Sequence, residues 1–285
     1  MLVAVPAARA ASVGMSVTSY LRIAWLALGL ALLSGLAWVV LEIAAMSGLP
    51  LDEAIADGMV PVVLTRTNFG IVSCARGALA VLLGVALWFA HVDAARWLAF
   101  VCAVALLGSL AWTGHAVGTV GALALPHLIG DALHCLAAGA WVGSLIPLVL
   151  LLAAARHHDD PQWDKLAYVA TRRFSTIGLI SVATLIITGL VNAWILVGSL
   201  EALVATEHGR LLQAKLGLFA LMLGLAAVNR LHWTPRLAQA AGPLGAQALR
   251  QLTRNGAVEA GLGAAVFIAV GALGTVHPAI HLVTP

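Results

Sequence analysis

Seven long apolar runs constrain the fold of this chain more than any other feature of its sequence. A helix needs about 20 mostly apolar residues to cross a bilayer, and lipid cannot satisfy the polar backbone of an open strand or loop. Each run is therefore predicted to be a membrane-spanning helix, at 23–46, 70–90, 97–114, 127–153, 174–198, 211–231 and 257–276. The predicted fold class is all-α, a polytopic transmembrane helical bundle of about seven spans.

The composition leaves little material for a water-facing surface. Of the 285 residues, 62% are hydrophobic and 9% are charged, and the mean hydropathy is +1.01. Soluble domains carry about 25% charged residues. We therefore expect residues 1–285 to form a single integral-membrane domain with the lipid bilayer as its partner. No basic block is long enough to indicate nucleic-acid binding.

The basic residues predict the orientation of the spans. Eleven of the fifteen Lys and Arg residues lie before the first span or in the 91–96, 154–173 and 230–256 connections. The other four are Arg66, Arg76, Arg210 and Lys215. Because Lys and Arg accumulate on the cytoplasmic side of membrane proteins, we predict the N-terminus inside and the C-terminus outside. The 232–256 stretch is expected to lie along the cytoplasmic surface of the inner membrane.

Metal-binding residue types gather near the outer face of this predicted bundle. His127, Asp131 and His134 fall in the first two turns of the fourth span, and their spacing of four and three residues places them on one helix face. His115 ends the third span, and His277 follows the last one. Imidazole nitrogens and carboxylates suit a transition-metal ion. The predicted metal ligands are therefore His127, His134, Asp131, His115 and His277.

The same residues also allow simpler interpretations. The His127, Asp131 and His134 face can instead be a hydrogen-bond network that packs helices together. His277 and His281, beyond the last span, are equally typical of residues that face the headgroup region. Because His127 and His134 are two turns apart, about 10 Å along the axis, one ion can just be shared between them. His134 paired with a neighbouring span is equally allowed.

Other polar residues divide between the two halves of the predicted bilayer. Glu42, Arg76 and Lys215 fall in the outer halves of their spans, either as buried charge pairs or as part of a transport path. Asn229 and Glu259 lie toward the inner face. Intramembrane ionisable residues are costly, so a functional role is the usual interpretation.

Several short motifs occur in a characteristic order along the chain. The longest is HLIGDALHCLAAGAWVG at 127–143, and the others are at 113–116, 173–175, 188–193, 209–216 and 229–235. In this order and spacing they resemble the copper resistance D (CopD) family of bacterial inner-membrane proteins. The resemblance implies copper transport or copper tolerance, with copper ion as the bound metal, often beside a periplasmic copper-binding partner protein.

One departure from the family pattern concerns the start of the chain. Members usually begin with one further span that carries a His near its outer end, and residues 1–15 are too short and irregular to supply it. Loss of that helix from an eight-span relative agrees with an N-terminus inside. We expect any upstream coding sequence to encode such a helix.

Three functions are compatible with these features. The first is a copper permease that imports periplasmic copper. The second is a protein that binds copper at the periplasmic face and delivers it without transport. The third is a b-type haem protein, because paired His residues on facing helices can ligate haem. The sequence contains no nucleophile–base motif and no phosphate loop, so enzymatic turnover is not expected.

Overall fold

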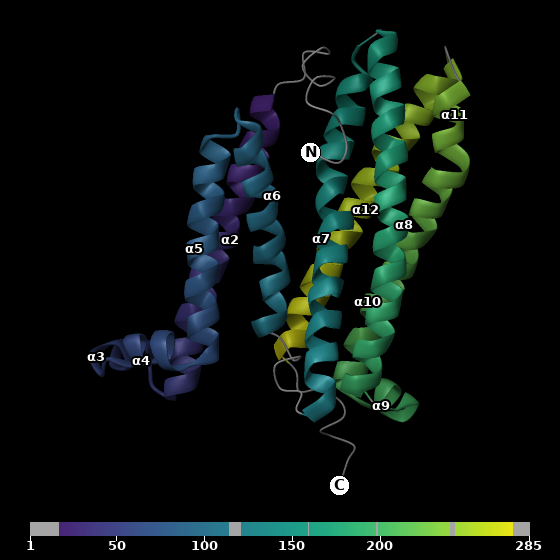
Figure 1. Ribbon diagram of the computed structural model, residues 1–285. Helices are drawn as coiled ribbons and strands as arrows, with labels where there is room; N and C mark the ends of the chain where they lie inside the picture. Colours follow the sequence, from purple (N-terminus) through teal and green to yellow (C-terminus); the bar gives the residue numbers. More distant parts are fainter. Residues whose placement is uncertain (1–16, 114–120, 159, 198, 240–242, 276–285) are drawn as a thin grey trace. The chain divides into compact units, whose positions relative to one another are not determined.

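The computed structural model describes residues 17–113, 121–158, 160–197, 199–239 and 243–275 (Figure 1). Every regular element in these ranges is helical, and seven of the helical segments are long and apolar enough to cross a membrane. The prediction of an all-α bundle with about seven spans is confirmed at this level. The chain divides into an N-terminal unit, residues 17–132, and a C-terminal unit that begins at Leu133. The boundary between the two units falls inside the helix Ala124–Ala155.

The N-terminal unit contains three candidate spans and a short helical corner. Helix α5 packs against α2, α4 and α6. This corner consists of two short helices, α3 and α4, which follow the first span and were not predicted from the sequence. The first turn of α3 contains the acidic residues Asp52 and Glu53. The elements are α2 (Val17–Ser47), α3 (Leu51–Ala56), α4 (Met59–Arg66), α5 (Asn68–Trp88), α6 (Asp93–Gly108) and the 3₁₀ segments η1 (Ser109–Thr113) and η3 (Gly121–Leu123).

The C-terminal unit contains most of helix α7 and three further long helical segments. Helix α10 packs against α9 and α12, and α11 packs against α8 and α12. The elements are α7 (Ala124–Ala155), α8 (Pro161–Val197), α9 (Leu200–Ala205), α10 (Glu207–Val228), the π-helical segment η4 (Asn229–Trp233), α11 (Thr234–Gln239) and α12 (Pro243–Thr275).

The starts of several helices are set by local sequence. Thr67 and Thr206 cap α5 and α10, because each hydroxyl accepts a 3.0 Å hydrogen bond from the backbone N–H three residues later. Pro161 and Pro243 open α8 and α12, the position where a missing N–H costs no helical hydrogen bond.

Two helices extend well beyond the predicted spans. Helix α8 begins at Pro161 rather than at 174, and α12 begins at Pro243 rather than at 257. The 232–256 stretch is thus mainly the helical end of two spans and not a connection along the membrane surface. The cause is packing between helices: buried apolar side chains repeat at helical spacing in these extensions.

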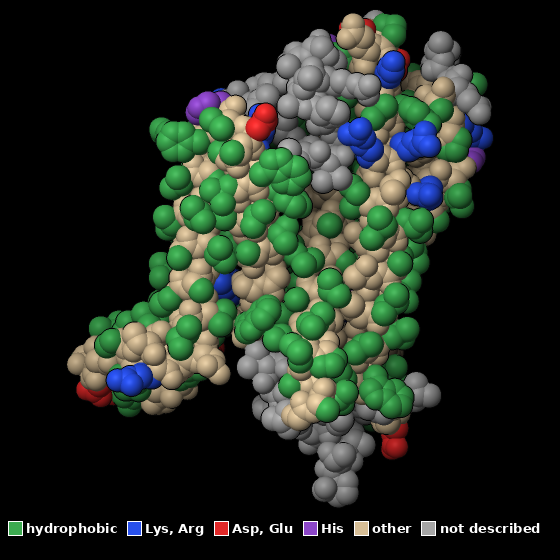
Figure 2. All heavy atoms as spheres, in the orientation of Figure 1, with side chains coloured by type: hydrophobic (Ala, Val, Ile, Leu, Met, Phe, Trp, Pro, Cys, Tyr) green, Lys and Arg blue, Asp and Glu red, His purple; other side chains and the backbone are tan. Residues whose placement is uncertain are grey.

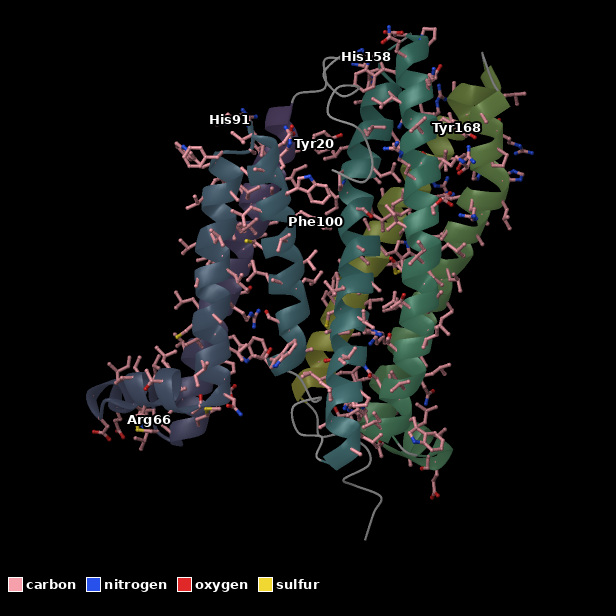
Figure 3. The ribbon with its side chains drawn as sticks, viewed as in Figure 1. Tyr20, Arg66, His91, Phe100, His158 and Tyr168 are labelled. Carbon is pink, nitrogen blue, oxygen red and sulfur yellow. The ribbon has the colours of Figure 1, made fainter. Side chains whose placement is uncertain are left out.

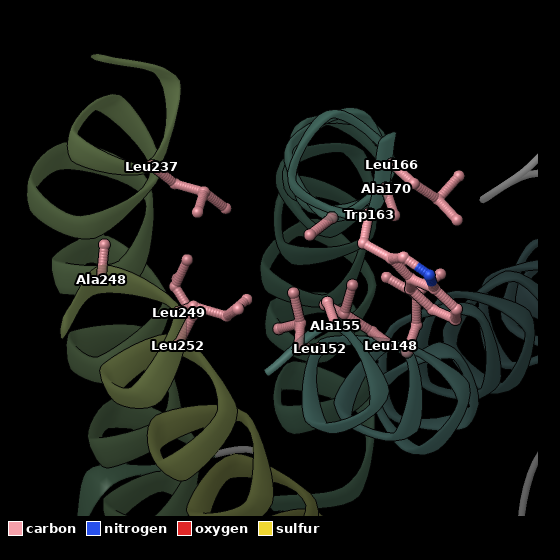
Figure 4. Close-up of a cluster of buried hydrophobic side chains, with 12 residues drawn as sticks. Leu148, Leu152, Ala155, Trp163, Leu166, Ala170, Leu237, Ala248, Leu249 and Leu252 are labelled. Carbon is pink, nitrogen blue, oxygen red and sulfur yellow. The ribbon is translucent and has the colours of Figure 1, made fainter. Parts of the chain in front are cut away.

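One buried cluster holds these extensions together (Figure 4). It joins α7, α8, α11 and α12 of the C-terminal unit. Its labelled members are Leu148, Leu152, Ala155, Trp163, Leu166, Ala170, Leu237, Ala248, Leu249 and Leu252. Burial of apolar area against neighbouring helices stabilises a helix outside the lipid in the same way as in a soluble protein.

The same end of the C-terminal unit carries most of its positive charge. Figure 2 shows Lys and Arg side chains gathered there, and Figure 3 marks this end with His158 and Tyr168. Arg156, Lys165, Arg172, Arg173, Arg230, Arg236, Arg250 and Arg254 of this unit are all exposed. An end so rich in exposed cations is typical of the cytoplasmic side.

The predicted orientation can be tested with reporters at two described connections. A reporter fused after His157, between α7 and α8, is expected in the cytoplasm. A reporter fused after Ala205, between α9 and α10, is expected on the periplasmic side, because one further span precedes it. Alkaline phosphatase and fluorescent-protein fusions measure the two sides independently. Finding both positions on one side of the membrane rules out this topology.

Candidate metal site

Helix α7 carries the predicted His127, Asp131 and His134 face without interruption. The helix is continuous from Ala124 to Ala155, so the three side chains keep the helical spacing expected from the sequence. His127 is buried, with a relative exposure of 1%, whereas Asp131 and His134 are half-buried. Both His127 and Asp131 already interact with other groups of the protein.

His134 is anchored to the neighbouring helix α8. Its Nδ1 lies 2.8 Å from Oγ1 of Thr188, which is buried. The Thr188 hydroxyl donates its single hydrogen to the carbonyl of Thr184 across 2.7 Å. The Thr188 oxygen must therefore accept the hydrogen bond, and the His134 Nδ1–H must donate it.

The direction of this hydrogen bond determines which ring nitrogen of His134 can bind a metal. In a neutral imidazole only one nitrogen carries the hydrogen, so with Nδ1 as the donor the lone pair of His134 is on Nε2. Metal-ligating histidines usually hold their tautomer and ring orientation by donating the other N–H to an acceptor, as His134 does to Thr188. His134 is thus prepared for ligation through Nε2.

Lys215 of α10 adds a positive charge to this region. Its side chain is half-buried and interacts electrostatically with His134. In surroundings of low dielectric constant, this charge repels a metal cation bound to the same imidazole. Asp131 lies three residues before His134 on the same face of α7.

The described residues do not form a complete ligand cage. Within the ranges given above, no group of three or more His, Cys, Asp or Glu side chains is close enough to hold a metal ion. Two predicted ligands, His115 and His277, lie outside the described residues, as does His281. The ligand set therefore stays a prediction. Among its members, His134 has a geometry that favours metal ligation.

Three of the other polar residues noted in the sequence have defined contacts. Arg76 places its guanidinium 5.8 Å from the ring centroid of Trp38 within the N-terminal unit, a cation–π contact. Glu259 is buried on α12 and accepts a 2.7 Å hydrogen bond from the Asn229 side chain.

Thr188 is a candidate site residue that sequence reasoning missed. It stands in the Thr188-Gly189 motif, but no role was assigned to it, because its contact with α7 depends on how two helices pack. A threonine followed by glycine in a span facing a histidine-bearing helix is the signal that could have indicated it. A Cβ added to Gly189 would lie 3.6 Å from His134 Cε1, an ordinary van der Waals distance, so the His134 ring lies against α8 at this residue.

Replacing Thr188 by Val tests the orienting hydrogen bond. The change keeps the shape of the side chain but removes the acceptor for His134 Nδ1–H. Changes of this kind in the outer shell of a metal site cost roughly 10–100-fold in affinity. We expect the copper affinity of purified Thr188→Val protein to fall by about that factor, measured by competition with a chelator.

The matched control for this change is Thr184→Val. Thr184 lies one turn earlier on α8, and its hydroxyl donates to the Ile180 carbonyl of the same helix. This variant is expected to bind copper as the parent does. Equal affinities for all three proteins would show that Thr188 does not prepare His134 for ligation.

Family comparisons cover most of the chain. The family model described as "Copper resistance protein D-like, N-terminal domain" matches residues 1–125. The model described as "Copper resistance protein D" matches residues 168–273. No solved structure matches the chain.

Three curated proteins are similar in sequence. "Copper resistance protein D" of Pseudomonas syringae pv. tomato is 33% identical over 60% of this chain and 56% of its own length. "Inner membrane protein YebZ" of Escherichia coli is 30% identical over 59% of this chain and 55% of its own length. "Copper transport protein CutJ" of Bacillus subtilis is 37% identical over 44% of this chain and 22% of its own length. The matches thus span about half, or less, of each relative.

Proposed function

Because the chain belongs to the copper resistance D family of multi-pass inner-membrane proteins, we propose that it imports copper across that membrane. Copper is the transported ion in this proposal, and the protein binds and releases it without any catalytic step. The relative from Bacillus subtilis carries copper transport in its name, which favours transport over storage.

The observation that carries the proposal is the hydrogen bond that orients the His134 ring. Its Nδ1–H is committed to Thr188, so Nε2 is available as a ligand atom in the membrane-embedded part of α7. An imidazole binds copper and zinc alike, so the choice of copper rests on the family. Asp131 and His127 on the same helix are the proposed partners, and His115 and His277 are the further proposed ligands.

Lys215 favours a site that binds copper transiently. A transport site has to bind its ion strongly enough to take it up and weakly enough to release it. An ammonium group near His134 lowers the affinity of the site for any cation.

The proposed direction of transport rests on the predicted orientation. The His127, Asp131 and His134 face lies in the first turns of α7, at the end opposite the exposed basic residues. With the basic end inside, this face lies toward the periplasm. Copper would enter there, delivered by a periplasmic copper-binding protein, and would leave toward the cytoplasm past α10 and α12.

Copper uptake into proteoliposomes tests the proposal. Vesicles that contain the purified protein are expected to accumulate copper faster than empty vesicles and to take up little zinc. Uptake at the rate of empty vesicles contradicts import. If the protein nevertheless binds copper, such a result favours delivery at the periplasmic face. A visible absorbance spectrum with haem bands in the purified protein would support the b-type haem alternative instead.

A further inference from the structure

A cavity of about 190 Å³, partly open to the surface of the protein, lies in the C-terminal unit, away from His134 along the helices. It is lined mainly by apolar side chains of α7, α8, α10 and α12, such as Trp141, Leu145 and Leu223. A water molecule occupies about 30 Å³ in the liquid, so the cavity can hold several. Such a cavity is expected to stay dry unless polar atoms face it.

Glu259 supplies such a polar atom. Its side chain lines the cavity and is 1% exposed. One carboxyl oxygen, Oε1, accepts a 2.7 Å hydrogen bond from Asn229 Nδ2. The Asn229 Oδ1 accepts in turn a 2.8 Å hydrogen bond from Asn255 Nδ2. The second carboxyl oxygen, Oε2, is buried and has no hydrogen-bond partner among the described residues.

The backbone is irregular at the same place. Asn229 begins the π-helical segment η4, and its carbonyl accepts a 2.8 Å hydrogen bond from the Thr234 hydroxyl. Single π-helical turns of this kind occur frequently at functional sites. The irregular turn and the Asn229–Glu259 hydrogen bond thus coincide at one wall of the cavity.

The free oxygen of Glu259 does not make a metal site. The hydroxyls of Thr171 and Ser175, which also line the cavity, already take part in hydrogen bonds to Ala167 and Arg230. The carbonyl oxygen of the Asn229 side chain is occupied by Asn255. One free carboxyl oxygen is too few for a transition metal, which needs about four ligands.

The charge of Glu259 also lacks a cationic partner. Among the described residues that line the cavity, the other ionisable side chain is Arg230. Its guanidinium hydrogen-bonds to the backbone oxygen and hydroxyl of Ser175, at 3.0 and 2.7 Å, and no ion pair between it and Glu259 is present in the described residues. The lining residues from α7 and α8 are not ionisable. An unpaired buried carboxylate is costly, and a bound proton removes that cost.

We propose that Glu259 is a proton-exchange site served by water in this cavity, and that its proton moves when copper passes through the protein. In the exchange, the O–H bond of the carboxyl breaks and the proton passes to a cavity water, leaving a carboxylate on Oε2. The reverse step restores the acid. Asn229 holds Oε1 in both states. The link to copper passage rests on the proposed function, whereas the protonation itself does not.

Infrared difference spectroscopy of the purified protein tests the protonation directly. A pH series is expected to contain a protonated-carboxyl band that shifts in heavy water and is lost in Glu259→Gln. Asn229→Ala removes the donor to Oε1 and is expected to move this band without abolishing it. Glu53→Gln, the same change at an exposed carboxyl of α3, should leave it in place. A pH series whose carboxyl bands are the same in parent and Glu259→Gln overturns the proposal.

Proteoliposomes with an enclosed pH-sensitive dye test the coupling. The parent is expected to move protons together with copper, and Glu259→Gln is expected to lose the proton signal down to the level of empty vesicles. An unchanged ratio of proton to copper flux in Glu259→Gln contradicts the coupling. Failure of the parent to take up copper counts against the proposed function, and the infrared band then still decides whether Glu259 exchanges a proton.

Discussion

Replacement of His134 by Ala is expected to weaken copper binding by roughly 100-fold or more. Loss of a residue that only orients a metal ligand lowers the metal affinity by roughly 10–100-fold, and loss of the ligand itself should lower it further. The expectation follows from the position of His134: its Nδ1–H is held by Thr188, and Nε2 is the prepared ligand atom. Insertion into the membrane should be unaffected, because alanine is tolerated well in an apolar helix. Chelator competition on the purified protein measures the affinity.

The control for this substitution is His157→Ala. His157 is exposed at the basic end of the C-terminal unit, so its loss should not change copper affinity. His127→Ala extends the test to the buried histidine of the same helix. If His134→Ala and His127→Ala both bind copper as tightly as the parent, the face on α7 is a helix-packing network and not a metal site.

Replacement of Gly70 by Ala is expected to destabilise the N-terminal unit by about 3 kcal/mol or more, the upper end of the usual cost of overpacking. A Cβ at this position would overlap the carbonyl oxygen of Val63 and lie 2.5 Å from Leu64 Cα. Both atoms belong to the backbone of α4, so no side-chain rotation can relieve the clash. The Gly70 N–H also donates to the Thr67 hydroxyl that caps α5, which holds the two helices in this arrangement.

Gly77→Ala is the matched control on the same helix. Nothing lies within 4 Å of a Cβ added there, so this variant should be as stable as the parent or slightly more stable. Unfolding of the detergent-solubilised proteins, followed by circular dichroism against temperature, compares the three. Equal midpoints for parent and Gly70→Ala would show that α4 and α5 do not pack as the structure has them.

The membrane-spanning parts of the fold could be predicted because lipid imposes one rule on every span. An apolar run of sufficient length has to be helical, and the structure contains a candidate span at each of the seven predicted places. The helix ends beyond the lipid could not be predicted in this way. The start of α8 depends on Trp163 and Leu166 packing into the buried cluster, which hydropathy alone does not reveal.

The candidate site, too, could be predicted only in part from the sequence. The common face of His127, Asp131 and His134 followed from helical spacing within one span. The roles of Thr188 and Lys215 depend on contacts between different helices, which no pattern within a single span contains. Asn229 and Glu259 were recognised as polar residues near the inner face, but their hydrogen bond joins α12 to the first residue of η4 and required the structure.

X-ray absorption spectroscopy of the copper-loaded protein tests the central claim most directly, because imidazole ligands give a characteristic scattering pattern around the metal. The account predicts imidazole nitrogen about 2 Å from copper in the parent, as in zinc–histidine sites, and a smaller imidazole contribution in His134→Ala. Identical spectra for parent and His134→Ala, or a parent spectrum without imidazole, would contradict the assignment of His134 as a copper ligand.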